Sequence, residues 1–244
     1  MPVRTTNRGH GGLTGYLARL PMPSQGTRHH EAGFIQFESA LEKDLFTVLR
    51  YLQHVTREVR WFEEQPLRID YLGAAGEPRH YTPDALVHYP RGRVTELIEV
   101  KYRADLRLHL NDWRPKFQAA RALCEARGWV FRVRTEHSIR TPLLDHASFF
   151  PPFLGRAHDP DDTRLVLDEV QRQGVSTPRA ILDALSPLVP QTLQTQTLLT
   201  GLDPHATRRA ALLSVLWTLV AHGFVLLDVS CPPSLASVLR PVGY

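Results

Sequence analysis

The chain has 244 residues, of which 43% are hydrophobic and 22% are charged, values that are ordinary for a globular protein of one large or two small domains. The longest apolar run, residues 210–221, is too short to span a bilayer, and because the polar N-terminus does not resemble a signal peptide, we expect none. The two cysteines form no CxxC pair, so we expect a reduced, cytoplasmic protein with no membrane partner.

Charge is distributed unevenly along the chain. Residues 157–244 hold six Lys and Arg against eight Asp and Glu, whereas residues 1–156 hold 23 against 17. The basic excess of the N-terminal part predicts a surface that faces a polyanion, although a mildly basic surface without a partner has the same composition. Lysine is rare: Lys43, Lys101 and Lys116 are the only three, so a lysine within a strand suggests a specific need for an amine.

In chain order, residues 1–33 are expected to form a flexible basic arm, because they carry four arginines and no acid before Glu31. Such an arm could order along DNA phosphates or be a tail without a role. Apolar periodicity then predicts a helix over 38–53 and a helix over about 112–127. Between and after them the pattern predicts strands over 59–62, 67–71, 80–89, 94–102 and 129–133.

Strands mixed with flanking helices predict an α/β layer fold, which we place at residues 34–155. After a proline-rich stretch at 149–153 the pattern becomes helical, over about 161–173, 177–186 and 203–222, and ends in a short hairpin. Helices followed by a small hairpin predict a winged-helix-like domain over residues 156–244.

A split motif carries the chemistry: Tyr81-Thr82-Pro83-Asp84 is followed by Ile98-Glu99-Val100-Lys101. Alternate residues of a strand share a face, so Asp84, Glu99 and Lys101 can converge if the two strands pair. Two carboxylates beside an amine are typical of PD-(D/E)xK nucleases, in which a divalent cation compensates the buried acids. The competing interpretation is a Glu–Lys ion pair on an exposed strand.

A third carboxylate should come from the first helix. Glu42 lies three positions before Leu45 and seven before Leu49, which places it at the inward edge of the apolar stripe. Glu38 lies on the same side one turn earlier. Both acids could instead complement the helix dipole, an interpretation that suits Glu38 better.

Together these residues resemble the TnsA family, the transposon endonucleases of heteromeric TnsA/TnsB transposases. The pieces that carry the resemblance are Ser39-Ala40-Leu41-Glu42, Glu64-Gln65-Pro66, Tyr81–Asp84, Ile98–Lys101 and Thr135-Glu136. The resemblance implies a restriction-endonuclease-like mixed sheet flanked by helices, with Glu42, Asp84, Glu99 and Lys101 as the catalytic residues. It also implies Mg²⁺, or Mn²⁺ as a substitute, held by Asp84, Glu99, the Val100 carbonyl and Glu42.

The resemblance further implies hydrolysis at the 5′ ends of a transposon, with double-stranded transposon-end DNA, a TnsB-like transposase and a TnsC-like AAA+ ATPase as partners. Such a protein would be bacterial and nucleoid-associated when assembled. The arginines that could contact phosphates around the core are Arg60, Arg68, Arg79 and Arg103, with Arg91 and Arg93 nearby. Two alternatives stay open: a stand-alone restriction or repair nuclease, and a non-catalytic DNA-binding assembly module.

Overall fold

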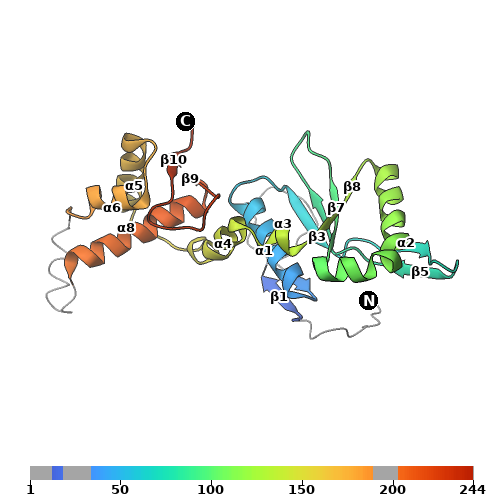
Figure 1. The fold of residues 1–244 in the computed structure, drawn as a ribbon. Coiled ribbons are helices and arrows are strands. Elements are labelled where there is room, and N and C mark those ends of the chain that lie inside the picture. The colour runs from blue at the N-terminus through green and yellow to red at the C-terminus, as the bar shows by residue number, and fades with distance from the viewer. Residues whose placement is uncertain (1–12, 19–33, 189–202, 244) are drawn as a thin grey trace. The chain divides into compact units, whose positions relative to one another are not determined.

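A computed structural model describes residues 13–18, 34–188 and 203–243 (Figure 1). The chain divides into two compact units, Met1–Leu144 and Asp145–Tyr244. Residues 145–155, which the sequence predicts to close the first domain, are therefore part of the second unit. None of the helices in the described part of the chain combines the length and apolar character that a bilayer crossing demands.

The first unit is built on a four-stranded mixed sheet in the order β3-β6-β7-β8. Its strands are β3 (Trp61–Glu64), β6 (Ala85–His88), β7 (Glu96–Val100) and β8 (Val130–Arg134). The first three pair antiparallel, and β7 pairs parallel with β8. Because parallel neighbours need a crossover, the chain between β7 and β8 forms the long helix α2 (Arg103–Arg127). The predicted α/β mixed sheet with flanking helices is confirmed.

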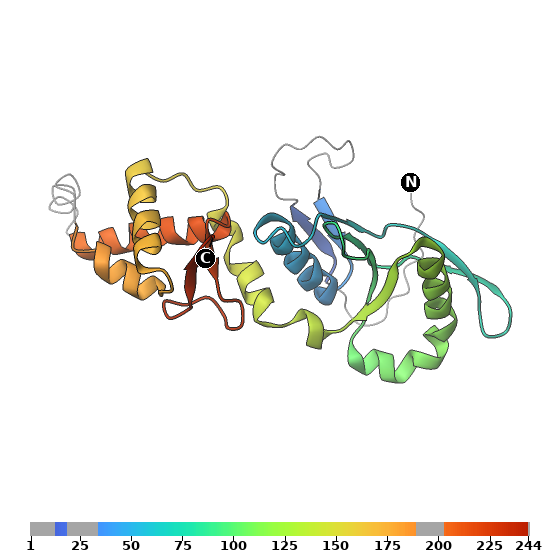
Figure 2. The same cartoon turned by 90° about the horizontal axis from the view of Figure 1, so that it is seen from above.

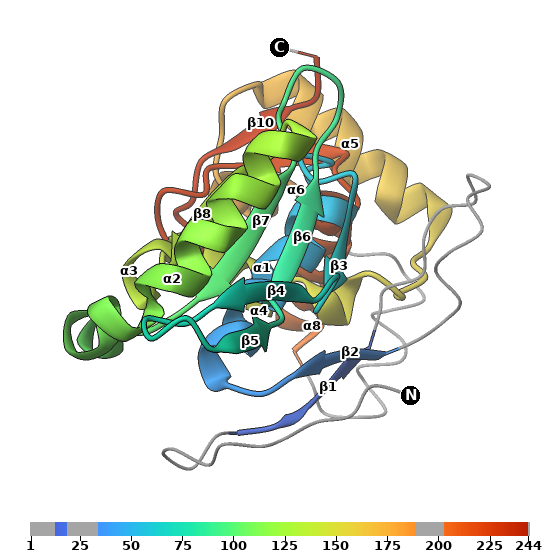
Figure 3. The same cartoon turned by 90° about the vertical axis from the view of Figure 1, so that its right-hand side faces the viewer.

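Helices cover both faces of this sheet, with α2 in front of it and α1 (Ala40–His54) behind it in Figure 3. On the α1 face the core contains Leu45, Phe46, Ala85 and Ile98. On the α2 face, Leu86 and Leu97 pack against residues of α2, including Ala120 and Cys124. The alternation along β6 and β7 therefore decides which helix each side chain meets, and it sends Glu99, two residues after Leu97, to the α2 side.

The stretch predicted as one strand over 80–89 is two strands. β5 (Pro78–Tyr81) pairs with β4 (Ile69–Leu72) in a separate hairpin, and β6 begins at Ala85. Pro83 lies between them, and a proline has no backbone N–H to donate to a ladder. The break places Asp84 immediately before β6 rather than within a continuous strand.

Part of the segment predicted as a flexible arm is a strand. β1 (Gly15–Ala18) pairs antiparallel with β2 (Phe34–Phe37). On one side of the strand Leu17 packs against the core, and on the exposed side Tyr16 meets Phe34 edge-on at 6.2 Å between ring centroids. Gly15 is required by this packing, because a Cβ there would lie 2.6 Å from Cζ of Phe37. The remainder of the predicted arm, residues 1–12 and 19–33, lies outside the described residues.

Helix α2 begins at Arg103, nine residues before the predicted start at 112. Its first turns are largely exposed, and Leu108 among them is 76% exposed. Apolar periodicity predicts a helix only where one face is buried, so it does not predict these turns. Pro115 lies inside the helix, and α2 bends into two segments (Figure 2). Beyond β8 the chain forms the short helix α3 (Glu136–Ile139) and then α4 (Pro142–Phe149).

The second unit contains the helices α5 (Pro160–Gln173), α6 (Pro178–Leu185) and α8 (Pro204–Ala221), which match the predicted helices. A short 3-10 turn, η1 (Pro151–Phe153), precedes them, and Phe149 and Phe150 pack against Trp217 of α8. These aromatic residues therefore pack within the second unit.

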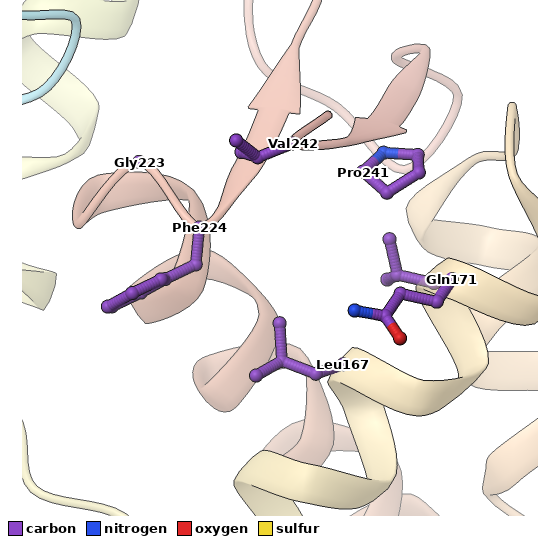
Figure 4. Close-up of a pocket in the computed structure, with 7 residues that line it drawn as sticks. Leu167, Gln171, Gly223, Phe224, Pro241 and Val242 are labelled. Carbon is purple, nitrogen blue, oxygen red and sulfur yellow. The ribbon is translucent and has the colours of Figure 1, made fainter. Parts of the chain in front are cut away.

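A two-stranded antiparallel sheet, β9 (Val225–Leu227) with β10 (Leu239–Pro241), closes the second unit. An antiparallel bridge from Ser176 to Leu239 adds a third short element between α5 and α6. A shallow pocket of about 250 Å³ lies between α5 and this sheet, lined by Leu167, Gln171, Phe224 and Val242 among others (Figure 4). The winged-helix assignment stays a prediction.

Candidate active site

Backbone hydrogen bonds fix Asp84 immediately before β6, an inner strand of the four-stranded sheet. Its N–H donates to the carbonyl of Ile98 on β7 at 3.0 Å, and its own carbonyl accepts from the N–H of Gln65, also at 3.0 Å. Gln65 has φ 47°, a left-handed conformation that turns the chain after β3 so that its N–H points at Asp84. Gln65 thus helps to fix the backbone of Asp84.

The predicted convergence of Asp84, Glu99 and Lys101 is present. Lys101 Nζ lies 3.0 Å from Oε1 of Glu99 and 3.9 Å from Oδ2 of Asp84. The backbone N–H of Val100 donates to Oδ2 of Asp84 at 2.6 Å, and Lys101 Nζ donates to the Val100 carbonyl at 2.8 Å. The pair is not an exposed ion pair, because only 2% of the Glu99 side chain is exposed.

Burial and charge together perturb the protonation of these groups. Burial, the negative charge of Glu99 and that of Glu42 raise the pKa of Asp84 to about 8, although Lys101 and the Val100 N–H oppose the shift. Burial by itself lowers the pKa of Lys101, but Asp84, Glu99 and Glu42 outweigh it and hold that pKa above its ordinary value. Ionised Asp84 is therefore costly in this site unless a further positive charge is present, which is the condition that favours an added cation.

Lys116 is a member of the cluster that sequence reasoning missed. It lies on α2, one residue after Pro115, and its Nζ lies 2.7 Å from Oε1 of Glu99. Only 13% of its side chain is exposed. The available signal was the rarity of lysine, since two of the three lysines in the chain meet at one carboxylate oxygen.

Glu42 belongs to the N-terminal cap of α1. Ser39 is the N-cap of α1 and accepts from the N–H of Glu42, while the Glu42 carboxylate accepts from Ser39 Oγ at 3.0 Å and from the N–H of Glu38 at 2.9 Å. The arrangement resembles a capping box, except that the return bond goes to the N–H of Glu38 and not to that of the N-cap Ser39. The helix-terminus role therefore suits Glu42 rather than Glu38, contrary to the expectation. The charge of Glu42 nevertheless reaches Asp84 and Lys101, as their pKa shifts show.

The donor set fits a divalent cation, with two carboxylates from adjacent strands and a main-chain carbonyl between them. Oε2 of Glu99 is buried and has no hydrogen-bond partner among the described residues, and the same is true of the Tyr81 hydroxyl. A cation or its water would satisfy such an oxygen. The described residues contain no group of three or more His, Cys, Asp or Glu side chains close enough to hold a metal.

The Thr135-Glu136 pair follows β8 and supports the start of α2. Thr135 is the N-cap of α3, and Oε2 of Glu136 accepts from the N–H of Arg103 at 3.0 Å. The N-cap residue of α2, Tyr102, offers no side-chain cap of its own. Glu136 therefore satisfies an N–H at the terminus of the helix that carries Lys116.

The four arginines expected to contact DNA are all in the first unit but differ in their surroundings. Arg68 pairs with Asp70 at 2.8 Å and Arg79 pairs with Glu77 at 2.5 Å. Arg103 begins α2, two residues after Lys101. Arg60 is exposed and makes no ion pair with a described residue.

Comparison with known proteins identifies one family. Residues 56–136 match the model for the TnsA-like endonuclease N-terminal domain. Asp84, Glu99, Lys101 and Lys116 lie inside the matched region, and Glu42 lies before it. No curated protein matches the chain. The match confirms the resemblance to TnsA-like endonucleases over residues 56–136 and places Asp84, Glu99, Lys101 and Lys116 in a TnsA-like endonuclease N-terminal domain.

Proposed function

With residues 56–136 assigned to a TnsA-like endonuclease N-terminal domain, we propose that this chain is the metal-dependent DNA endonuclease subunit of a TnsA/TnsB-type transposase. In this proposal it hydrolyses one phosphodiester at the 5′ end of each transposon end, which permits cut-and-paste excision. The observation that carries the proposal is that Asp84, Glu99 and Lys101 meet where β6 begins and β7 ends, inside the matched region.

Asp84, Glu99 and the Val100 carbonyl would hold Mg²⁺, with Mn²⁺ as a substitute, and Glu42 would act at longer range. When bound, the cation supplies Lewis-acid chemistry, which lowers the pKa of a coordinated water and stabilises charge on the phosphate. Asp84 is oriented by the Val100 N–H before any ligand arrives, so little reorganisation is needed. Lys101 stays protonated and directs its ammonium group at the scissile phosphate or the attacking water.

The proposed partners are double-stranded transposon-end DNA, a TnsB-like transposase and a TnsC-like AAA+ ATPase. The basic surface of the first unit favours DNA there, since arginines bind phosphates without reading sequence. The second unit has a net acidic sequence, with eight Asp and Glu against six Lys and Arg over 157–244. That charge favours a protein partner over DNA for its winged-helix-like fold.

A stand-alone restriction or repair nuclease is the second candidate, because the same three residues would serve it. Activity on naked DNA without partner proteins would favour it. A non-catalytic assembly module is disfavoured by the burial of Glu99, since an unneeded buried carboxylate is costly to keep.

The test is a cleavage assay with end-labelled transposon ends, a TnsB-like and a TnsC-like protein and Mg²⁺. We expect the unmodified chain to cut the 5′ ends and Lys101→Ala to abolish cutting, while its melting curve stays cooperative and it still binds its partners. Normal cutting by Lys101→Ala would refute the site assignment. Cutting without either partner would refute the assignment of the chain as a transposase subunit and would favour a stand-alone nuclease.

A further inference from the structure

Two ammonium groups meet at one oxygen of Glu99. Lys116 Nζ lies 2.7 Å and Lys101 Nζ lies 3.0 Å from Oε1, whereas Oε2 is buried without a partner among the described residues. Lys101 lies two residues after Glu99, just beyond the end of β7, as the nuclease motif requires, but Lys116 comes from α2 and has no place in that motif. Oε1 of Glu99 therefore has two ammonium partners, whereas Oε2 has no hydrogen-bond partner among the described residues.

Aromatic rings hold the Lys116 ammonium in place. Its Nζ lies 5.0 Å from the ring centroid of Tyr81, 5.1 Å from that of Trp113 and 5.2 Å from that of Phe117. A cation within about 6 Å of an aromatic ring is attracted to the ring's electron-rich face. Three rings around one ammonium stabilise its charge in a largely dry position, so Lys116 is not a surface lysine that pairs with Glu99 by chance.

We propose that Lys116 is a positioning residue that occupies Glu99 while no metal is bound and thereby sets the affinity of the site for a divalent cation. The proposal rests on the proposed function, because it takes Asp84 and Glu99 as metal ligands. A cation that binds Glu99 must approach an ammonium fixed 2.7 Å from the neighbouring oxygen of the same carboxylate. Like charges at such range repel strongly in a buried site.

The direction of the change in cation affinity distinguishes this role from that of a metal ligand and from a purely structural role. Lys116→Met keeps an unbranched side chain between the rings but removes the charge, so the repulsion disappears and divalent cations should bind more tightly. Loss of a ligand such as Glu99 should have the opposite effect. A lysine that only stabilises the fold would change the melting temperature and leave the cation affinity where it was.

The experiment is isothermal titration of the full chain with Mn²⁺ in metal-free buffer without DNA. We expect Lys116→Met to bind Mn²⁺ about tenfold more tightly than the unmodified protein. Lys116→Arg keeps the charge and should stay within about twofold, as should Arg114→Met, which removes an exposed charge from the same helix. Glu99→Gln should bind more weakly. Melting curves verify that each variant is folded, and Lys116→Gln replaces Lys116→Met if the latter is not.

An unchanged or weaker Mn²⁺ affinity in folded Lys116→Met would overturn the inference. If the unmodified protein binds Mn²⁺ and cuts transposon ends, that result leaves the proposed function standing. If the unmodified protein neither binds Mn²⁺ nor cuts, the proposed function and the inference both fail.

Discussion

The carboxylate of Asp84 and the backbone N–H of Val100 form a hydrogen bond of 2.6 Å between neighbouring strands. Val100 lies between Glu99 and Lys101, so this one bond ties the upstream acid of the split motif to its downstream half. The bond orients the Asp84 side chain without the help of a ligand, and it satisfies a buried N–H that would otherwise lack a partner.

We expect Asp84→Asn to preserve the fold and to abolish cleavage. The amide oxygen of asparagine can accept from Val100, and the neutral side chain resembles the protonated form that a pKa of about 8 favours at neutral pH. Asp84→Ala should also be inactive but less stable by about 1–3 kcal/mol, because it leaves the N–H unpaired. Urea unfolding combined with the cleavage assay tests both variants, and wild-type cleavage by Asp84→Asn would contradict the role given to the carboxylate.

Without metal, the free energy of unfolding should fall as pH rises from about 4 to about 8. Burial and Glu99 raise the pKa of Asp84 to about 8 in the folded protein, above the ordinary value of 3.8. Over this window the folded state binds more protons than the unfolded state, so each step up in pH favours unfolding. Urea midpoints in EDTA from pH 5 to pH 8 measure the effect.

The matched control is Asp84→Asn, which lacks this proton and should lose the corresponding part of the slope. Mg²⁺ should stabilise the unmodified protein increasingly over the same pH range, because it binds the ionised carboxylate. Parallel pH curves for the two proteins in EDTA would argue against the shifted pKa.

The convergence of Glu99 and Lys101 was predictable from the sequence because side chains alternate between the two faces of a strand with a period of two residues. Glu99 and Lys101 share a face with Leu97, and the core residues on each side of the sheet follow that alternation. Asp84 was found for the same reason, although Pro83 splits its strand. Periodicity alone does not distinguish one continuous strand from two strands that are separated by a proline.

Lys116 was not predictable because its place depends on the path of a bent helix. Pro115 lies inside α2, and only the tertiary packing of its second half brings position 116 over Glu99. The capping role of Glu42 was misassigned for a smaller reason. The helix begins at Ala40 rather than 38, which moves Glu42 to the third helical position after the Ser39 cap.

Glu42→Gln should reduce cleavage strongly while costing less than about 1 kcal/mol of stability. Glutamine retains an oxygen for the Glu38 N–H and an amide that can donate to Ser39 Oγ, so the hydrogen bonds at the start of α1 survive. The negative charge that reaches Asp84 and Lys101 is lost. Single-turnover cleavage with a urea melt on the same samples measures both quantities.

Glu38→Gln is the matched control, since it removes an equal charge just before the same helix. We expect it to cleave at close to the unmodified rate. If Glu38→Gln lowers cleavage and Glu42→Gln does not, the helix carboxylate of the site is Glu38.

Among the arginines, Arg60→Gln should weaken DNA binding more than Arg68→Gln or Arg79→Gln. Arg68 and Arg79 each pair with an acid, so part of their charge is already neutralised, whereas Arg60 is exposed and has no ion pair with a described residue. One lost phosphate contact should lower the slope of log K against log salt by about 0.9. Fluorescence anisotropy with a labelled transposon end in EDTA, titrated with salt, measures that slope. Equal slopes for Arg60→Gln and the unmodified protein would remove Arg60 from the DNA-binding surface.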